Sequence, residues 1–383
     1  MPSSRRRPAA RVRVRRAPHL VLYWRDRELV VENYRTGSRV AAGPGVVELL
    51  ASLEEWTDPA SLTVALPAYD RRSVAGALAH LVRRSIVERA RRRSDASRSS
   101  RSDSKWAAWH PEPGLLHFSS KDLTYQEFAR SSHALRAQAR RRRRPPAVKR
   151  YPDAPSIALP LPSTSSEFPQ VLLARRTWRR FSSRAVSLEA LGTLLGLSSR
   201  VQYWANVPGI GRLPLKTYPS GGAQHPLEVY VLARRIAGLG PGLYHYASDA
   251  HRLERLTRGA SGQQIVRYLP AQTWYRSAAA LVIITAVFPR TQWKYQFPRA
   301  YRAVLTEAGH LCQNLCLTAT WLGLAPFCSL ALADSVIERD LGIDGVSESV
   351  LYAAGVGARP PDADWAPWPT RQRRIRRKPN RSG

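Results

Sequence analysis

The 383-residue sequence has few cysteines and no long apolar run. Its three cysteines are too few for a disulfide framework, and no Cys-x-x-Cys pair indicates structural zinc. No uninterrupted apolar stretch approaches the roughly 20 residues that a membrane-spanning helix needs. The N-terminal segment, MPSSRRRPAARVRVRR, has neither the apolar core nor the cleavage site of a secretory signal. We therefore expect a soluble, cytoplasmic protein.

Several common catalytic and nucleotide-binding motifs are also missing. No Gly-x-Gly-x-x-Gly follows a predicted strand, so the sequence gives no support to a dinucleotide-binding fold. It contains no P-loop, no Gly-x-Ser-x-Gly and no His-Glu-x-x-His. P-loop NTPases, serine hydrolases of the nucleophile-elbow type and zinc proteases of the His-Glu-x-x-His type are therefore excluded.

Acidic residues are scarce relative to basic ones. The chain has 28 Asp and Glu against 60 Lys and Arg, a net charge of +32. Many of the arginines lie in four clusters within predicted tails or linkers, over 1–16, 83–101, 140–144 and 371–383. Such runs can bind phosphate backbones, but solvated charge is the commoner explanation, and we do not expect specific nucleic-acid binding. An acidic peptide or protein partner fits the charge better.

Residues 18–90 read as a small unit. Alternating residues in His19–Trp24 and Leu29–Tyr34 predict a hairpin. Helices are expected over Gly45–Leu53, after the Asp58-Pro59 cap and from Asp70. A hairpin with three helices suits a winged-helix-like domain. Such a domain can enter a DNA groove, clamp an extended peptide on a strand edge, or simply pack on its neighbour.

The rest of the chain divides by composition. We expect residues 1–17 to be a basic disordered tail, 91–155 a basic linker and partly ordered connection, and 362–383 a basic C-terminal tail. Residues 156–361 form the main domain, which begins with a strand over Ser156–Pro162. Its further elements predict an α+β fold: helices over Leu188–Leu197 and Ala303–Leu322, and strands over Leu227–Ala233, Ala279–Val287 and Leu351–Val356.

Three segments of the main domain combine residues that suit a bound ligand. RRTWRRF (175–181) places guanidinium groups, which match phosphate oxygens, before a helix that opens at Ser187. The turn YPSGGA (218–223) lets backbone approach a planar ligand through its glycines. Lys294 and Tyr295 stand side by side, where they could act as acid, base or substrate-orienting groups. Each segment alone has a purely structural explanation.

A fourth segment, EAGHLCQN (307–314), lies on the long predicted helix. His310 is one turn from Glu307 and Asn314, which is typical of a core histidine with satisfied hydrogen bonds. Cys312 and Cys316 are four residues apart among apolar residues, and His310 and Cys312 are not spaced for zinc. We expect these cysteines to be core residues and predict no metal site.

Taken in order, these segments resemble the nitroreductase-like flavoproteins, and among them the SagB-type (ThcOx or McbC-type) dehydrogenases. The resemblance runs from about Phe168 to Gly357. It is carried by RRTWRRF, TYPSGGAQHPLEVYV, GLYHY, WKYQFPRAYR, EAGHLCQNLCLTATWLGL and LGIDGVSESVLYAAGVG. A peptide-recognition-like N-terminal extension is common in this group, which agrees with residues 18–90. Two departures, a longer Lys-Tyr to Arg-Ala-Tyr-Arg spacing and Ala325–Leu332 in place of a glycine-rich stretch, point to a peptide-maturation dehydrogenase offshoot.

The resemblance implies a nitroreductase-like α+β fold that binds FMN at a homodimer interface. By motif matching, three groups of residues would bind FMN. Those at the phosphate and ribityl chain would be Arg175, Arg176, Thr177 and Arg179, with a tail residue such as Arg373. Those against the ring would be Pro219, Ser220 and Gly221, and a backbone contact near flavin N5 would come from Leu330 or Ala331.

The activity implied is oxidation of an azoline ring in a ribosomally made peptide to a thiazole or oxazole. Lys294 and Tyr295 match the pair associated with this activity, and either could take the ring proton. A cyclodehydratase is a possible partner beside the precursor peptide. Two alternatives stay open: an NAD(P)H-dependent nitroreductase or quinone reductase, and a non-catalytic peptide-binding relative. A transcription factor is a distant further alternative.

Overall fold

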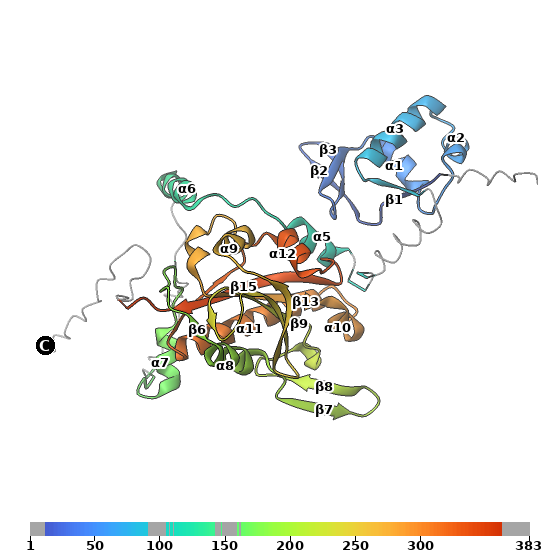
Figure 1. The fold of residues 1–383 in the computed structure, drawn as a ribbon. Helices are drawn as coiled ribbons and strands as arrows, with labels where there is room; N and C mark the ends of the chain where they lie inside the picture. Colours follow the sequence, from blue (N-terminus) through green and yellow to red (C-terminus); the bar gives the residue numbers. More distant parts are fainter. Residues whose placement is uncertain are drawn as a thin grey trace, which may run out of the picture.

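The computed structural model describes residues 12–90, 105–106, 108–109, 111–141, 147, 159–160 and 162–361. These residues form an N-terminal unit, a helical connection and a larger α+β domain (Figure 1). Of the predicted strand over Ser156–Pro162 the structure describes Leu159, Pro160 and Pro162, and none of these three is in a strand. The rest of that segment and the C-terminal tail from 362, with Arg373, lie outside the described residues.

The N-terminal unit is built from two small sheets and short helices. Strands β2 (Leu20–Arg25), β3 (Glu28–Asn33) and β4 (Ser38–Ala41) form an antiparallel meander, and β1 (Arg13–Arg16) pairs with β5 (Val87–Ala90). The helices are α1 (Pro44–Ala51), η1 (Pro59–Ser61), α2 (Leu62–Ala65) and α3 (Arg71–Arg83). Asp70 caps α3 by accepting a hydrogen bond from the Ser73 backbone N–H at 2.9 Å. Their apolar faces share one core, which includes Val31, Leu53, Leu62 and Leu81.

The predicted hairpin and the helix beginning after Asp70 are therefore present in the structure. The predicted basic tail, residues 1–17, needs correction, because Arg13–Arg16 is strand β1. Val14 is buried in this strand and its backbone also pairs with Thr57. Successive side chains of a strand point to opposite sides, so Val14 faces the core while Arg13 and Arg15 point away from it. The burial of Val14 alone therefore anchors β1 to the core.

The connection is more ordered than a linker. Helix α5 (Glu112–Ser119) follows two tryptophans, and α6 (Phe128–Arg141) follows α5. The Trp106 indole donates to the Val346 carbonyl at 2.8 Å, and the Trp109 indole donates to the Tyr295 carbonyl at 2.9 Å. Both tryptophans are buried in the core of the main domain. The stretch predicted as a connection thus contributes core residues to the domain that follows it.

Helix α5 also contacts the N-terminal unit. The Phe118 ring stacks on Tyr34 with centroids 6.3 Å apart, and the Arg35 guanidinium lies 5.9 Å from the Phe118 ring. On its other side the His117 Nδ1 atom and the Tyr301 hydroxyl are 2.9 Å apart. Burial lowers the pKa of His117 to about 3, so the imidazole is neutral at physiological pH. Helix α5 therefore bridges the two units.

The main domain is organised around a six-stranded antiparallel sheet of order β12-β11-β9-β13-β15-β14. Its strands are β9 (Leu227–Ala233), β11 (Gly242–Ala247), β12 (Arg252–Arg258), β13 (Ala280–Val287), β14 (Leu324–Ser329) and β15 (Glu348–Ala358). The short strands β6 (Val186–Ser187) and β10 (Ile236–Ala237) pair in parallel. Strands β7 (Tyr203–Val207) and β8 (Gly211–Leu215) form a separate hairpin, which projects from the domain in Figure 1.

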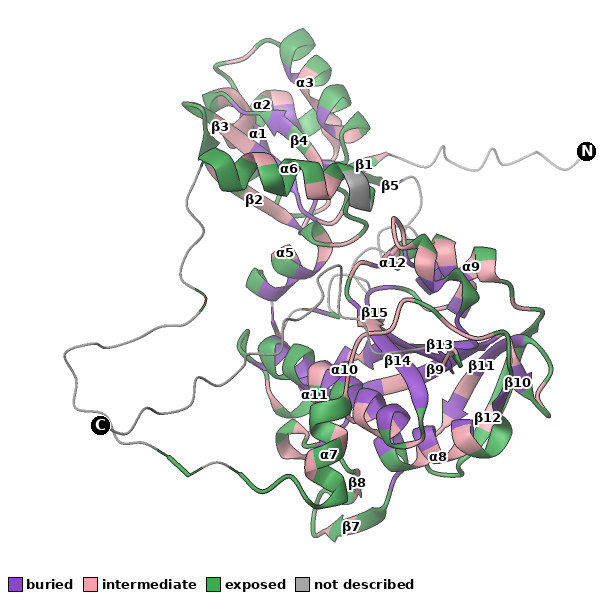
Figure 2. Ribbon diagram, turned by 90° about the vertical axis from the view of Figure 1, so that its left-hand side faces the viewer, coloured by how far each residue is buried: buried purple, intermediate pink, exposed green. Residues whose placement is uncertain are grey.

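Helices cover both faces of this sheet (Figure 2). Alternate β13 residues enter two cores: Val282 and Ile284 pack with α8 (Leu188–Ser199) and α11 (Ala300–Trp321), whereas Leu281 and Ile283 pack with α9 (Gly262–Tyr268) and α12 (Asp334–Leu341). Because both faces are buried, β13 reads as a continuous apolar run. The remaining helices are α7 (Glu167–Ala174), η2 (Gly221–Ala223), η3 (Thr273–Ser277) and α10 (Phe288–Lys294).

The predicted elements at Leu188–Leu197, Leu227–Ala233, Ala279–Val287, Ala303–Leu322 and Leu351–Val356 are all present, within a few residues of their expected ends. The α+β prediction is confirmed. Among the helices that the structure describes, none has the length and apolar character needed to cross a membrane.

Candidate active site

The turn between β8 and β9 forms one wall of a cavity. Tyr218 is buried at its start, and the Ser220 hydroxyl accepts a hydrogen bond from the His225 backbone N–H at 2.8 Å, which closes the turn. Gly222 has a φ of 60°, a left-handed conformation that costs glycine little. The turn therefore presents Pro219, Ser220 and Gly221 to the cavity as a narrow backbone surface.

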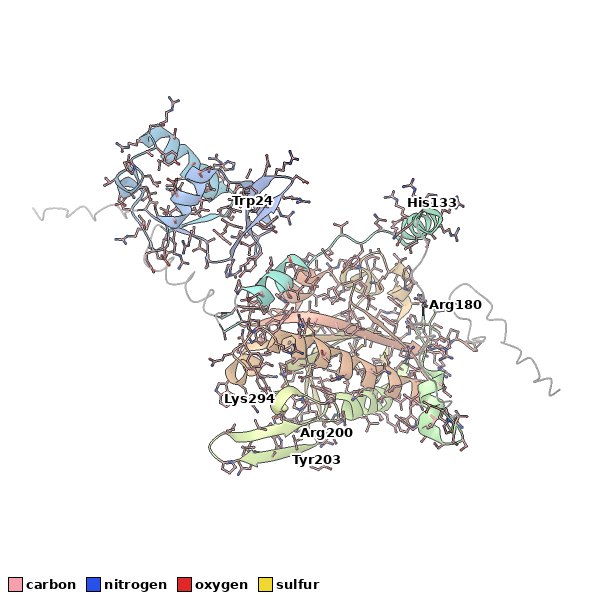
Figure 3. All side chains as sticks on the ribbon, turned by 180° about the vertical axis from the view of Figure 1, so that it is seen from behind. Trp24, His133, Arg180, Arg200, Tyr203 and Lys294 are labelled. Carbon is pink, nitrogen blue, oxygen red and sulfur yellow. The ribbon has the colours of Figure 1, made fainter. Side chains whose placement is uncertain are left out.

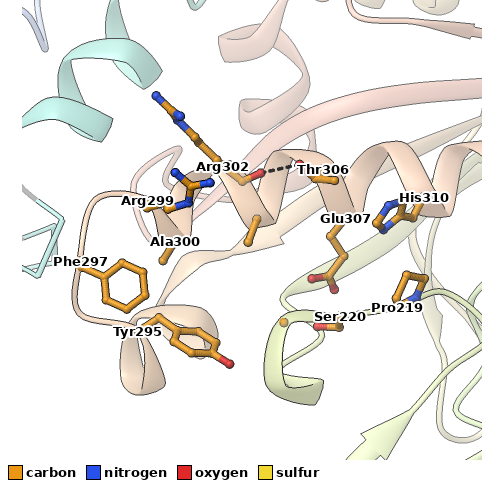
Figure 4. A pocket seen from close by; sticks show the side chains of 12 residues that line it. Pro219, Ser220, Tyr295, Phe297, Arg299, Ala300, Arg302, Thr306, Glu307 and His310 are labelled. Carbon is orange, nitrogen blue, oxygen red and sulfur yellow. Dashed lines mark hydrogen bonds between the residues drawn. The ribbon is translucent and has the colours of Figure 1, made fainter. Parts of the chain in front are cut away.

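The first three turns of α11 form the opposite wall (Figure 4). The cavity has a volume of about 630 Å³, within the range usual for small-molecule sites. Tyr295 and Phe297, from the loop between α10 and α11, line its mouth. The full lining is Pro219, Ser220, Gly221, Tyr295, Phe297, Arg299, Ala300, Arg302, Ala303, Thr306, Glu307 and His310.

Glu307 is the buried acid of this cavity. Its carboxylate lies against the Ser220 hydroxyl and the Gly221 backbone N–H, which both favour its charged form and so connect α11 to the turn. Its Oε1 atom lies 3.8 Å from the Nδ1 atom of buried His225, and within the described part of the chain neither atom has a hydrogen-bond partner. Burial raises the pKa of Glu307 to about 7. Burial and the nearby Lys216 lower the pKa of His225 to about 4, so this imidazole is neutral at pH 7.

Glu307 was not among the candidates from sequence, which read its segment as core. That reading holds for Leu311 and Leu315, which are buried under the sheet. Glu307 is the one signal that the sequence offers for this site, because a carboxylate on the apolar side of a helix is rarely buried without a partner. Its partners lie on the 218–223 turn, far away in sequence, and no local pattern reveals them.

We expect Glu307→Gln to stabilise the protein at high pH and to leave it unchanged at low pH. The folded pKa of about 7 lies above the ordinary 4.5, so the unfolded state loses this proton first and stability falls as pH rises between these values. The free energy of unfolding at pH 8 should therefore rise by at most about 3 kcal/mol in the variant, with no gain at pH 4.5. Denaturant titrations at both pH values measure this. An equal effect at both pH values would contradict the assignment of the titration to Glu307.

The Lys294–Tyr295 pair lies at the C-terminal end of α10, against the turn. A Cβ atom built on Gly222 would be 2.5 Å from both the Lys294 Nζ atom and the Tyr295 hydroxyl. Both polar ends thus converge on one backbone position next to Gly221. Gly221 and Tyr295 line the cavity, whereas Lys294 does not and its side chain is largely exposed. The Lys294 Nζ atom is 5.5 Å from the centroid of the Tyr295 ring. The structure therefore brings together the predicted Lys-Tyr pair and the predicted Pro219–Gly221 turn.

The predicted phosphate-binding residues lie elsewhere. Residues 175–181 follow α7 and run beside β14, where the Trp178 backbone N–H donates to the Pro326 carbonyl at 2.9 Å. Of the four, Arg176 donates to the Arg175 carbonyl at 2.7 Å at the end of α7, and none of Arg175, Arg176, Thr177 and Arg179 lines the cavity. Figure 3 shows Lys294 and Arg180 at opposite sides of the domain. One chain therefore does not assemble both halves of the predicted flavin site.

The predicted backbone contacts lie after β14. Leu330 is largely exposed, and its carbonyl is 3.5 Å from the Tyr125 hydroxyl. The Ala331 backbone N–H donates to the Ser329 hydroxyl at 3.1 Å, so an internal hydrogen bond already uses it. Neither residue lines the cavity. Of the two, Leu330 remains the candidate for a backbone contact with a ligand.

Comparison with known proteins decides the family. Residues 172–358 match the model of the nitroreductase family. The putative nitroreductase MJ1384 of Methanocaldococcus jannaschii is 32% identical over 173 residues, which are 45% of this chain and 83% of MJ1384. The chain belongs to the nitroreductase family.

Two further relatives are peptide-processing proteins. The trifolitoxin-processing protein TfxB of Rhizobium leguminosarum bv. trifolii is 31% identical over 173 residues, 44% of this chain and 46% of TfxB. The microcin B17-processing protein McbC of Escherichia coli is 29% identical over 143 residues, 36% of this chain and 51% of McbC. The chain thus spans about half the length of each. The predicted resemblance to McbC-type nitroreductases is confirmed.

Two solved structures are similar to part of this chain. A chain of the E. coli microcin synthetase McbBCD complex, solved with truncated pro-MccB17 bound, has a TM-score of 0.43 at 21% identity and covers 63% of this chain and 85% of its own. A putative Desulfovibrio desulfuricans nitroreductase, solved in complex with FMN, has a TM-score of 0.35 at 18% identity and covers 54% of this chain and all of its own.

The residues of this nitroreductase fit a flavin in two separate places. The cavity offers the apolar surface of Pro219, Tyr295 and Phe297 with a few polar groups, as a planar ring system requires. The 175–180 segment supplies the cations that a phosphate requires.

Proposed function

We propose that this nitroreductase is an FMN-dependent dehydrogenase that oxidises a ribosomally made peptide during its maturation, converting an azoline to an azole. The observation that carries the proposal is the convergence of the Lys294 amine and the Tyr295 hydroxyl on Gly222, beside the cavity that Gly221 and Tyr295 line. The peptide-processing relatives TfxB and McbC support a peptide substrate.

The reaction removes a proton from one ring carbon and a hydride from the next. FMN accepts the hydride when bound, which is the cofactor's own chemistry. The protein must hold the ring against the 218–223 turn and supply a base. Lys294 is the candidate base for the proton, since its amine is accessible and lies close to the Tyr295 hydroxyl, which orients the substrate. Glu307 keeps the turn in place through Ser220 and Gly221.

We propose that two copies of the chain complete each flavin site. The ring-facing turn and the arginine segment lie apart in one chain, so a second copy supplies whichever half is missing. Helix α7, which leads into the arginines, exposes the apolar side chains of Phe168, Leu172 and Leu173. Exposed apolar groups on one short helix suit an interface between copies. Sedimentation of the flavin-loaded protein should give twice the chain mass.

The experiment that tests the function starts from the absorption spectrum of the purified protein, with mass spectrometry of what heat releases. Released FMN supports the flavin role. Azoline-containing peptides, prepared with a cyclodehydratase, should then lose two hydrogens per ring. Rapid NAD(P)H oxidation with a quinone and no peptide oxidation would favour the reductase alternative. Absence of flavin after reconstitution would favour a non-catalytic peptide-binding protein.

The N-terminal unit carries a groove that suits the peptide. Strand β2 is at the edge of its sheet, and with α1 it borders a cavity of about 620 Å³. Its lining places apolar side chains and charges of both signs beside the strand edge: Leu20, Leu22, Val47 and Leu50 with Arg15, Arg16, Glu54 and Glu55. An extended peptide can add to such an edge through main-chain hydrogen bonds, with its side chains in the pockets. An acidic leader would also match the positive charge of the chain.

We expect Leu22→Asp to raise the KM for the full-length peptide by about tenfold or more, with little change in kcat. Leu22 is about half exposed on β2 and lines the groove, so the carboxylate removes an apolar contact without disturbing the core. Val64→Asp is the matched control, since Val64 is exposed on α2 and does not line this groove. Unchanged KM in Leu22→Asp would count against peptide binding here.

A further inference from the structure

The three cysteines of the chain meet at one place. Cys312 and Cys316 are one turn apart on α11, and Cys328 is on β14. The three sulfur atoms all lie within 4.8 Å of one another. Cys312 and Cys316 are buried and Cys328 is partly exposed. No other cysteine exists in the sequence, so the cluster gathers every thiol of the protein.

The fold explains how distant cysteines converge. Helix α11 ends at Trp321, and the chain reverses at Gly323, where φ is 68°, directly into β14. The strand then runs back beside the helix, and the Cys328 side chain packs on the core that holds Cys312 and Cys316. Each cysteine can be substituted singly while the other two remain, so the contribution of each thiol can be measured separately.

Tyr352 on β15 is a polar neighbour of Cys328. The Tyr352 hydroxyl donates to the Cys328 sulfur at 3.7 Å. Among the residues that the structure describes, no histidine or carboxylate joins the three sulfurs as a further metal ligand.

We propose that Cys312, Cys316 and Cys328 bind a divalent thiophilic metal ion of the zinc class, with a water molecule as the fourth ligand on the exposed side of Cys328. Three protein ligands and an open position are a known arrangement for zinc. Zinc–sulfur bonds of about 2.3 Å place tetrahedral sulfurs about 3.8 Å apart, so the cluster needs only to contract by about 1 Å or less.

Charge balance favours a divalent ion. Binding releases a proton from each thiol, and three thiolates with a divalent cation carry one net negative charge. Arg175, at the end of α7, lies near enough to Cys316 and Cys328 for its positive charge to offset part of that negative charge. Buried charge without such compensation is costly.

The test is a titration of the reduced, full-length protein with Co²⁺ under anaerobic conditions, followed by displacement with Zn²⁺. We expect intense thiolate-to-cobalt absorption that saturates at one ion per chain and disappears with Zn²⁺. Because the chain has no other thiol, this absorption reports on the cluster alone. Cys328→Ser should abolish most of it. Tyr352→Phe, which keeps all three sulfurs, is the matched control and should retain it.

A second measurement needs no variant. One equivalent of Zn²⁺ should slow alkylation of the partly exposed Cys328 at least tenfold, as mass spectrometry of the modified peptide can show. Absence of thiolate-to-cobalt absorption in the folded, reduced protein would overturn the proposal and leave the cysteines as core residues. Equal absorption in the wild type and Cys328→Ser would overturn it too. Neither result depends on flavin binding or peptide oxidation.

Discussion

Lys294→Ala is expected to lower kcat for peptide oxidation by about 100-fold or more while FMN stays bound. General-base catalysis by a positioned side chain is typically worth 10²–10⁴-fold, and the amine of Lys294 is held within the small space beside Gly222. The side chain is largely exposed and packs on no core residue, so its truncation should leave the fold intact. Stopped-flow reduction of the flavin by the peptide separates this step from reoxidation.

The matched control for this variant is Lys105→Ala. Lys105 pairs with Asp344 at 2.7 Å, outside the cavity, so the same change of residue type should leave the rate of flavin reduction unchanged. Tyr295→Phe separates the role of the tyrosine hydroxyl from that of its ring, because it removes the hydroxyl and keeps the ring in the cavity lining. Loss of FMN from Lys294→Ala would make the lysine a structural residue instead, and an unchanged rate would remove it from the reaction.

The second large effect is expected for Gly222→Ala. The added Cβ atom would lie 2.5 Å from the Lys294 Nζ atom and from the Tyr295 hydroxyl, closer than any normal contact, so both side chains must move. A displacement of about 1 Å can cost about 100-fold in rate when geometry is critical. We expect kcat to fall by about this factor, with a smaller change in KM.

Backbone strain must be separated from this clash, since Gly222 has a φ of 60°. Gly209 provides the control. Its φ is 74°, and a Cβ atom there would meet nothing within 4 Å, so Gly209→Ala introduces the strain alone. Equal losses of activity in the two variants would assign the effect to strain or general destabilisation. Circular dichroism and flavin content establish that both variants are folded.

The sequence predicts the elements of this fold well where one local pattern suffices. The Asp70 cap, the hairpin on either side of Asp26 and the apolar run of β13 each contain their own signal, because caps, alternation and runs are local. Strand β1 is missed because a single buried residue, Val14, lies in an arginine-rich segment. Trp106 and Trp109 are missed as core residues because their partners, Val346 and Tyr295, are far away in sequence.

The candidate site likewise contains residues that local motifs reveal and residues that only tertiary contacts reveal. The Lys294–Tyr295 pair and the 218–223 turn are found from their motifs, and the structure places them in contact. The buried acid Glu307 and the cysteine cluster depend on tertiary contacts, since Ser220 and Cys328 approach α11 from other segments. Spacing rules cannot detect such sites, because ligands on different elements have no fixed separation in sequence.

The Trp109 contact limits how this protein can be divided into parts. The Trp109 indole donates a hydrogen bond to the Tyr295 carbonyl. Phe118 of α5, the helix that follows Trp109, stacks on Tyr34 of the N-terminal unit. A fragment that starts after α5 would lose a core side chain of the nitroreductase domain and the hydrogen-bond donor to the Tyr295 carbonyl. A chimera that carries a foreign N-terminal unit must therefore be joined before Lys105 and must keep both native tryptophans with the nitroreductase domain.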